Sequence, residues 1–161
     1  MDNLCHTLAG AALAECGFTQ RTRFATAAMA IGANIPDVDV LALLAGGLIG
    51  LESRRGLTHG IPALALWPFV VVGGVILWAR LVRRGSPQPM VPRVLLLGAA
   101  IAVVSHPLLD WLNTYGVRFL MPFSERWFYG DTLFIVDLVL LALFGSGWWL
   151  ARRNRRRELP G

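Results

Sequence analysis

Long apolar stretches are the feature that most limits how this 161-residue chain can fold. Residues 61–82 carry no charge before Arg80 and are about as long as the roughly 20 residues that cross a hydrocarbon core of about 30 Å as a helix. Two more stretches, residues 94–109 and 132–151, come close to that length. Hydrophobic residues make up 55% of the chain and charged residues only 16%, which is too apolar for a soluble domain of this size. The sequence therefore predicts an integral membrane protein.

A fourth apolar stretch, residues 24–51, is interrupted by the polar sequence NIPDVD at residues 34–39. A helix broken at membrane depth is tolerated only where protein or a water-filled cavity satisfies the freed backbone groups. The first apolar segment, residues 4–16, is too short to span and contains His6 and Glu15, so we expect it to pack on or partly in the membrane. The predicted fold is an all-α polytopic membrane helix bundle with about four spanning helices, one of them broken, plus a short N-terminal helix.

The positive charges predict an orientation. The chain contains 15 arginines and no lysine, and most of the arginines cluster at residues 21–23, 80–93 and 152–157. The positive-inside rule places these clusters in the cytoplasm of a bacterial cell, which makes both termini cytoplasmic. We expect one membrane-embedded domain over residues 1–151 and a basic cytoplasmic tail over residues 152–161. The tail is interpreted as a topological anchor, and no nucleic acid partner is expected.

The three histidines and several aspartates predict a metal site within this apolar chain. His106 and Asp110 are four residues apart, so they share one face of a helix. Imidazole nitrogens and carboxylate oxygens are ligands of zinc, manganese and iron. Placing an ionisable group in a membrane costs at least about 2.5 to 3.5 kcal/mol, which favours a functional role. We expect a divalent metal, zinc before manganese or iron, with ligands drawn from His6, Asp37, Asp39, His59, His106 and Asp110.

Each of these residues also has a simpler interpretation, which the sequence leaves open. Asp37 and Asp39 are favoured helix N-caps after a proline turn. His59 has a capping or interfacial alternative, and the pair at positions 106 and 110 could be a structural hydrogen bond. His6, on a helix of small residues, could simply be hydrogen-bonded. The sequence does not define the roles of two further acids, Asp131 and Asp137.

The order of the polar motifs resembles the YdjM-like family of inner-membrane metal-dependent hydrolases. The resemblance covers about residues 3 to 125 and rests on His6, IPDVD at residues 35–39, RRGLTHG at 54–60, SHPLLD at 105–110, NTYG at 113–116 and LMPF at 120–123. The usual family motif HRGxTHS is RRGLTHG here, with an arginine at the first histidine position and Gly60 at the serine position. His59 aligns with the second histidine of that motif.

The resemblance implies a hydrolase. The family is itself similar to the zinc-dependent phospholipase C and single-strand nuclease group, which implies cleavage of a phosphoester or related ester of a lipid or lipid-linked substrate. A metal-activated water would attack the ester, and the expected catalytic residues are Asp37, Asp39, His106 and Asp110. The expected substrate-binding residues are Arg55, Asn113, Tyr115 and Arg118, with interfacial snorkelling as the alternative for the arginines. A divalent metal or proton transporter using the same site, or a non-catalytic membrane scaffold, are the other functions considered.

Overall fold

The structure is a computed structural model that describes residues 1–45, 54–82 and 88–158. Helices are the only regular elements in these three ranges, together with two isolated β-bridges. The elements in chain order are α1 (Asn3–Glu15), α2 (Phe18–Arg21), α3 (Ala25–Gly32), the 3₁₀ helix η1 (Ile35–Ala45), the 3₁₀ helix η2 (Leu57–His59), α5 (Ile61–Val82), α6 (Pro92–Leu112) and α7 (Leu138–Glu158). The predicted all-α class is therefore confirmed for the part of the chain that the structure describes.

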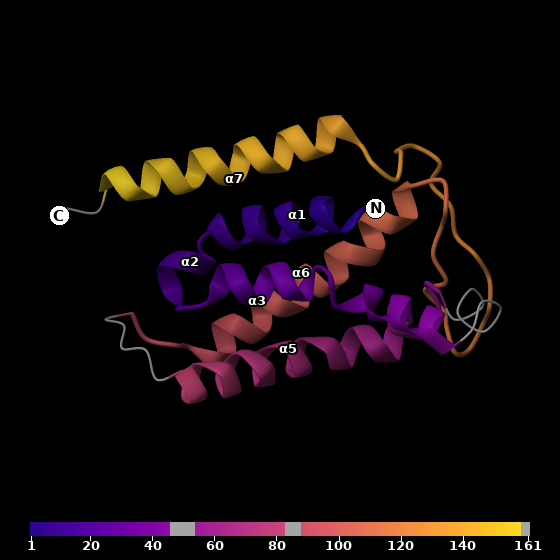
Figure 1. Ribbon diagram of the computed structural model, residues 1–161, viewed down its shortest axis with the longest axis horizontal. Coiled ribbons are helices and arrows are strands. Elements are labelled where there is room, and N and C mark those ends of the chain that lie inside the picture. The colour runs from indigo at the N-terminus through magenta and orange to yellow at the C-terminus, as the bar shows by residue number, and fades with distance from the viewer. Residues whose placement is uncertain (46–53, 83–87, 159–161) are drawn as a thin grey trace.

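The helices form a bundle in which α7, α1, α3 and α5 lie side by side and α6 crosses them obliquely (Figure 1). The predicted short N-terminal helix corresponds to α1. It begins after Asp2, whose side chain accepts hydrogen bonds from the backbone N–H groups of Leu4 and Cys5. Helix α6 contacts α1, α3 and α5, so its side chains reach the centre of the bundle.

Two helices, α5 and α6, are long and apolar enough to span a membrane. The predicted number of about four spans is not confirmed. The apolar stretch at residues 24–51 is broken as predicted, because α3 ends at Gly32 and η1 begins at Ile35, while residues 46–51 lie outside the described residues. The stretch at residues 132–151 becomes helical only from Leu138, and α7 then runs on into the basic tail. Arg83 and Arg84, part of the second arginine cluster, also lie outside the described residues.

Small side chains let the central helices approach closely. One buried cluster joins α3, α5 and α6 through Ala28, Val71, Val72, Val75, Leu95 and Ala99, and a second joins α1, α3 and α6 through Ala14, Met29, Ala33 and Ala102. By contrast, large apolar side chains on the outer faces of α5 and α6 are exposed, including Phe69 (61%) and Leu97 (58%). This pattern of small residues inside and large apolar residues outside is typical of helices packed in lipid.

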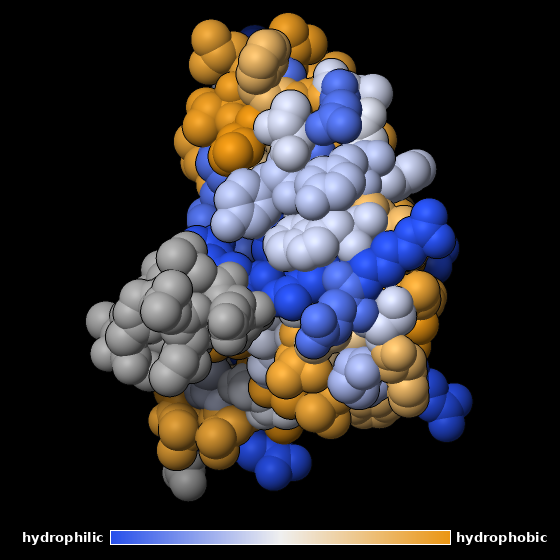
Figure 2. Space-filling model, turned by 90° about the vertical axis from the view of Figure 1, so that its right-hand side faces the viewer, coloured by the Kyte–Doolittle hydropathy of each residue, from blue (hydrophilic) through white to orange (hydrophobic). Residues whose placement is uncertain are grey.

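Polar side chains gather at the end of the bundle where α6 finishes. Residues 113–137 between α6 and α7 cross this end and form the two isolated bridges, between Asn113 and Leu133 and between Val117 and Phe128. Figure 2 shows this end as a band of hydrophilic and weakly polar side chains, with hydrophobic side chains above and below. The C-terminal half of α6, which carries His106 and Asp110, leads into this end.

Candidate metal centre

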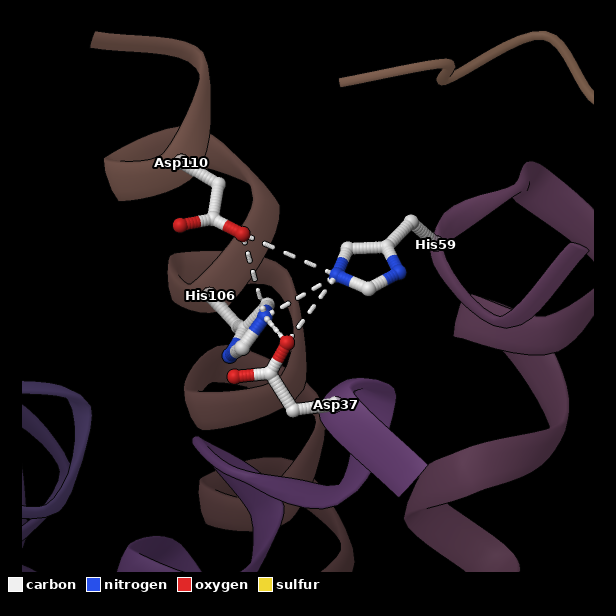
Figure 3. A group of neighbouring side chains, drawn as sticks. All are labelled: Asp37, His59, His106 and Asp110. Carbon is white, nitrogen blue, oxygen red and sulfur yellow. Dashed lines mark hydrogen bonds and ion pairs between the residues drawn. The ribbon is translucent and has the colours of Figure 1, made fainter. Parts of the chain in front are cut away.

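Four side chains from three elements point toward one another near the end of α6 (Figure 3). His106 and Asp110 come from successive turns of α6, Asp37 comes from the first turn of η1, and His59 comes from η2. Asp37 follows Pro36, and the break between α3 and η1 redirects the chain so that this carboxylate faces α6. His59, His106 and Asp110 are fully buried, and Asp37 is 8% exposed.

The spacing of the four ligand atoms fits one metal ion. Five of the six distances among His59 Nε2, His106 Nε2, Asp37 Oδ1 and Asp110 Oδ2 lie between 3.1 and 3.8 Å, and all four atoms lie within 4.8 Å of one another. Ligand atoms placed tetrahedrally about 2.0 to 2.1 Å from an ion are about 3.3 to 3.4 Å apart. The group Asp37, His59, His106 and Asp110 can therefore hold a metal ion.

Hydrogen bonds behind the two imidazoles turn their Nε2 lone pairs toward this centre. His106 Nδ1 lies 2.6 Å from the carbonyl oxygen of Ala33, so Nδ1 carries the proton and donates it. The Thr58 hydroxyl donates to Asp39 Oδ2 over 3.2 Å and lies 2.9 Å from His59 Nδ1. With its own proton given to Asp39, the hydroxyl oxygen accepts from His59 Nδ1. Both Nε2 atoms are then left unprotonated, which is the form that binds metal.

A cation would relieve the electrostatic conflict in this arrangement. The two Nε2 atoms are 3.1 Å apart, and neither has a proton to share with the other. Asp37 Oδ1 and Asp110 Oδ2 are buried and accept no hydrogen bond from the described part of the chain. Buried polar atoms without partners are costly, so the donor set fits a bound metal ion.

The second oxygen of Asp110 faces a set of positive and polar groups. Asp110 Oδ1 forms an ion pair with the Met1 amine, lies 3.2 Å from Arg55 Nη2, and accepts a 3.3 Å hydrogen bond from Asn113 Nδ2. The carboxylate is thus held from one side while its other oxygen points to the metal centre. Arg55 is itself buried, and its Nη1 donates to the Asn113 side-chain oxygen at 3.2 Å and to the Gly116 carbonyl at 3.0 Å.

Two of the six predicted metal ligands lie beside the group of four. Asp39 stands behind His59, 3.6 Å from its Nδ1, and also accepts the backbone N–H of Arg55 at 2.6 Å. His6 stacks on His106 with ring centroids 3.8 Å apart, and its Nε2 is 3.4 Å from Asp110 Oδ1. Neither nitrogen of His6 has a hydrogen-bond partner among the residues described, and burial lowers its pKa to about 4. His6 is therefore a neutral ring at the edge of the site.

Two of the four predicted substrate-binding residues, Arg55 and Asn113, contact Asp110, and the other two, Tyr115 and Arg118, contact Arg55. The Arg55 guanidinium lies over the Tyr115 ring at 4.6 Å, and the side-chain oxygen of Asn113 accepts backbone N–H groups from Tyr115 and Gly116. Arg118 stacks on Trp127 at 4.9 Å and donates to the Arg54 carbonyl at 2.9 Å. Among the four, only the Tyr115 ring is well exposed, at 42%. The contacts described here organise the loop, and a substrate role for these residues stays a prediction.

The remaining acids lie away from the centre. Asp137 accepts the backbone N–H of Leu140 at 3.0 Å and so caps the start of α7. Asp131 adopts a left-handed backbone conformation with φ of 50° in the 113–137 segment. Neither belongs to the group that could hold a metal among the described residues.

Sequence reasoning missed two groups that set the geometry, Thr58 and the carbonyl of Ala33. The role of Thr58 could have been predicted from the sequence, because a hydroxyl directly before a ligand histidine can hydrogen-bond to that ring. The Ala33 carbonyl is free to accept from His106 because α3 ends at Gly32, and only the packing of α3 on α6 brings the two together.

Replacing Thr58 with valine is expected to weaken metal binding by about 10-fold to 100-fold, because the His59 ring loses the group that sets its tautomer and orientation. Thr58→Ser keeps the hydroxyl and should bind metal like the wild type. Thr132→Val removes an exposed hydroxyl that bonds only to the Leu112 carbonyl, and it serves as the control. The measurement is metal affinity in detergent by competition with a chromophoric chelator. Equal affinity for Thr58→Val and wild type would show that this hydroxyl does not orient His59.

Comparison with known proteins places this chain in a family of membrane proteins. The family model described as YdjM inner membrane protein matches residues 1–160. The uncharacterized protein YfhP of Bacillus subtilis (strain 168) is 28% identical over 123 residues, which cover 72% of this chain and 35% of that protein. The chain thus spans about a third of the length of this relative, and no solved structure gives a significant match. Two apolar helices long enough to span a membrane agree with the family description. The chain belongs to the YdjM family of inner membrane proteins.

Proposed function

We propose that this protein is a metal-dependent hydrolase that cleaves a phosphoester or related ester of a membrane lipid or lipid-linked substrate. The observation that carries the proposal is the convergence of two oriented imidazole Nε2 atoms and two unpaired carboxylate oxygens within 4.8 Å of one another. Two nitrogens and two oxygens at tetrahedral spacing suit zinc, while manganese and iron commonly take more ligands. We therefore propose zinc as the metal.

A catalytic metal needs one position that substrate or water can reach. Three of the four residues are fully buried, whereas Asp37 is 8% exposed and also lines a cavity of about 520 Å³. In our proposal Asp37, His59, His106 and Asp110 hold the ion, and the corner at Asp37 is where water and substrate reach it. The site is thus closed on the side of α6 and open on the side of η1.

The residues of the site have distinct roles in this proposal. A divalent ion held there would supply a Lewis acid that polarises the ester and makes water more acidic. Asp37 would bind the ion through Oδ1, and its second oxygen would accept the proton of the attacking water and return it to the leaving oxygen. Asp39, through Thr58, would keep His59 in its metal-binding tautomer. Arg55 would hold Asp110 in place from the far side.

The membrane setting supports a lipid substrate. The family is described as an inner membrane protein, and α5 and α6 bring the site to the end of two candidate spans. His106 and Asp110 lie in the last two turns of α6, so the site sits toward the end of that helix. At that level an ester between a lipid chain and its polar head group would meet the metal centre.

The test is an activity assay with purified protein on a panel of phospholipids, polyprenyl phosphates and generic phosphodiesters. We expect one class to be hydrolysed, a chelator to abolish the reaction, and a divalent metal to restore it. Asp37→Asn should lower the rate by at least about 100-fold, as expected when a positioned proton acceptor is lost. Asp137→Asn makes the same change at an aspartate outside the site and should retain the wild-type rate. If no ester is hydrolysed and metal-loaded protein moves metal ions or protons across liposomes, the site belongs to a transporter.

A further inference from the structure

An apolar groove of about 480 Å³ lies between α3 and α5. One side is formed by Phe24, Ile31 and Ile35, and the other by Val70, Gly74 and Trp78. From Val70 to Trp78 the groove follows α5 for about 12 Å, at 1.5 Å per helical residue. Several of these side chains are well exposed, with Ile31 at 48% and Trp78 at 61%. Because α5 is a candidate membrane span, the groove would face the hydrocarbon of the bilayer.

The groove adjoins a second cavity whose lining includes Asp37 of the candidate metal group. This cavity, of about 520 Å³, shares Ile31 and Ile35 with the groove, so the two hollows are neighbours along the same face of α3. Its other lining residues include Thr7, Asn34 and Asp37. Asp37 belongs to the group that could hold the metal. The apolar groove along the membrane span therefore lies next to a cavity that Asp37 and a few other polar side chains line.

One polar side chain in the lining of this cavity, Asn34, is held in place by its own hydrogen bonds. Asn34 Nδ2 donates to the Thr7 hydroxyl at 3.0 Å and to the Ala30 carbonyl at 2.8 Å, which fixes the orientation of the amide. The amide oxygen is buried and has no partner in the described structure. The Asn34 amide is therefore a fixed polar group within a mainly apolar lining.

We propose that the α3–α5 groove binds a hydrocarbon chain of the lipid substrate, and that the adjoining cavity receives its polar head group next to Asp37. This inference rests on the proposed hydrolase function and narrows the substrate to amphiphilic esters with a long chain. Water-soluble phosphodiesters would lack the part of the substrate that the groove recognises.

Two neighbouring glycines on α5 allow a matched test. Gly74 lines the groove and Gly73 does not, and a Cβ added at either position meets no atom within 4 Å in the described structure. Gly74→Leu should therefore fill the groove without disturbing the helix packing, and Gly73→Leu makes the same chemical change on another face of the helix. Ala27→Leu narrows the groove from the α3 side and provides a second, independent variant.

The first measurement is binding, by native mass spectrometry of delipidated protein with added palmitoyl-oleoyl phosphatidylglycerol. We expect wild type and Gly73→Leu to hold one lipid, and the affinity of Gly74→Leu and Ala27→Leu for that lipid to fall by at least about 10-fold. All four proteins should keep the same metal content, since none of the changes touches the site. Equal lipid binding by Gly74→Leu and wild type would overturn the inference. The inference would also be overturned if Gly74→Leu changed the protein from a dimer to a monomer without loss of lipid. The groove would then be a contact between two copies of the chain.

The second measurement separates this inference from the proposed function. The assay uses an ester of the class that the wild type hydrolyses. Hydrolysis of a version with a long chain is compared with hydrolysis of a version with a six-carbon chain. Gly74→Leu should lower kcat/KM for the long-chain ester by at least about 10-fold and leave the short-chain rate within about twofold. If the wild type hydrolyses neither ester while the binding results hold, the proposed function fails and the groove stands as a lipid site. An equal loss for both chain lengths would contradict the groove as the chain site.

Discussion

Purified wild-type protein is expected to hold about one equivalent of a transition metal, and His106→Ala or His59→Ala to lose most of it. Each substitution removes one of four ligands from a group whose atoms are spaced for a single ion, and leaves two carboxylate oxygens with one imidazole. The affinity should fall by at least about 100-fold, more than when a supporting hydrogen bond is removed. The measurement is elemental analysis of detergent-purified protein after dialysis against a weak chelator.

His6→Phe separates two versions of this site. Phenylalanine keeps an aromatic ring stacked on His106 but has no nitrogen to offer a metal. If the metal is held by Asp37, His59, His106 and Asp110, this variant should retain it. Loss of the metal would instead support the sequence prediction that His6 is a ligand. Wild-type protein that carries no transition metal, and is not stabilised by adding one, would rule out the site altogether.

Arg55→Leu is expected to lower the free energy of unfolding by roughly 3 kcal/mol. Removing one partner of a buried ion pair typically costs about 3 to 5 kcal/mol, because the remaining charge has lost its compensation. The lower end applies here, since the Met1 amine and Asn113 still face Asp110 Oδ1 after the change. Asn113 and Gly116 also lose a donor to their oxygens. Metal affinity should fall as well, because Asp110 is no longer held toward the centre.

Arg54→Gln provides the matched control for Arg55→Leu. The Arg54 side chain is 26% exposed, and its Nε is 3.9 Å from Asp39 Oδ1, so the pair contributes about 0 to 1 kcal/mol. Chemical unfolding in detergent measures both variants, and metal content is determined on the same samples. Arg55→Leu with wild-type stability and metal affinity would show that the buried guanidinium does not support Asp110, and would return Arg55 to the predicted role of substrate contact.

The helical class, the short first helix and the break in the segment at residues 24–51 could be predicted from the sequence alone. Each follows from local chemistry: apolar length limits a chain to helices in lipid, and the polar sequence around Pro36, which has no backbone N–H to donate, favours a break in the helix. The relation between His106 and Asp110 was equally local, because residues four apart on a helix share a face. The number of spans could not be predicted from local chemistry, because α7 joins an apolar half to a basic half in one helix.

Which acids face the same centre was decided by tertiary structure. Asp37 and Asp39 are equivalent in sequence, one on each side of Val38, yet Asp37 points to His106 while Asp39 lies behind His59. The turn of η1 sends neighbouring side chains in different directions, and only its packing against α6 and η2 determines which one reaches the histidines. The sequence alone determined that imidazoles and carboxylates lie within an apolar helical chain. The tertiary structure selected four of them, because ligand geometry depends on distances between elements that are far apart along the chain.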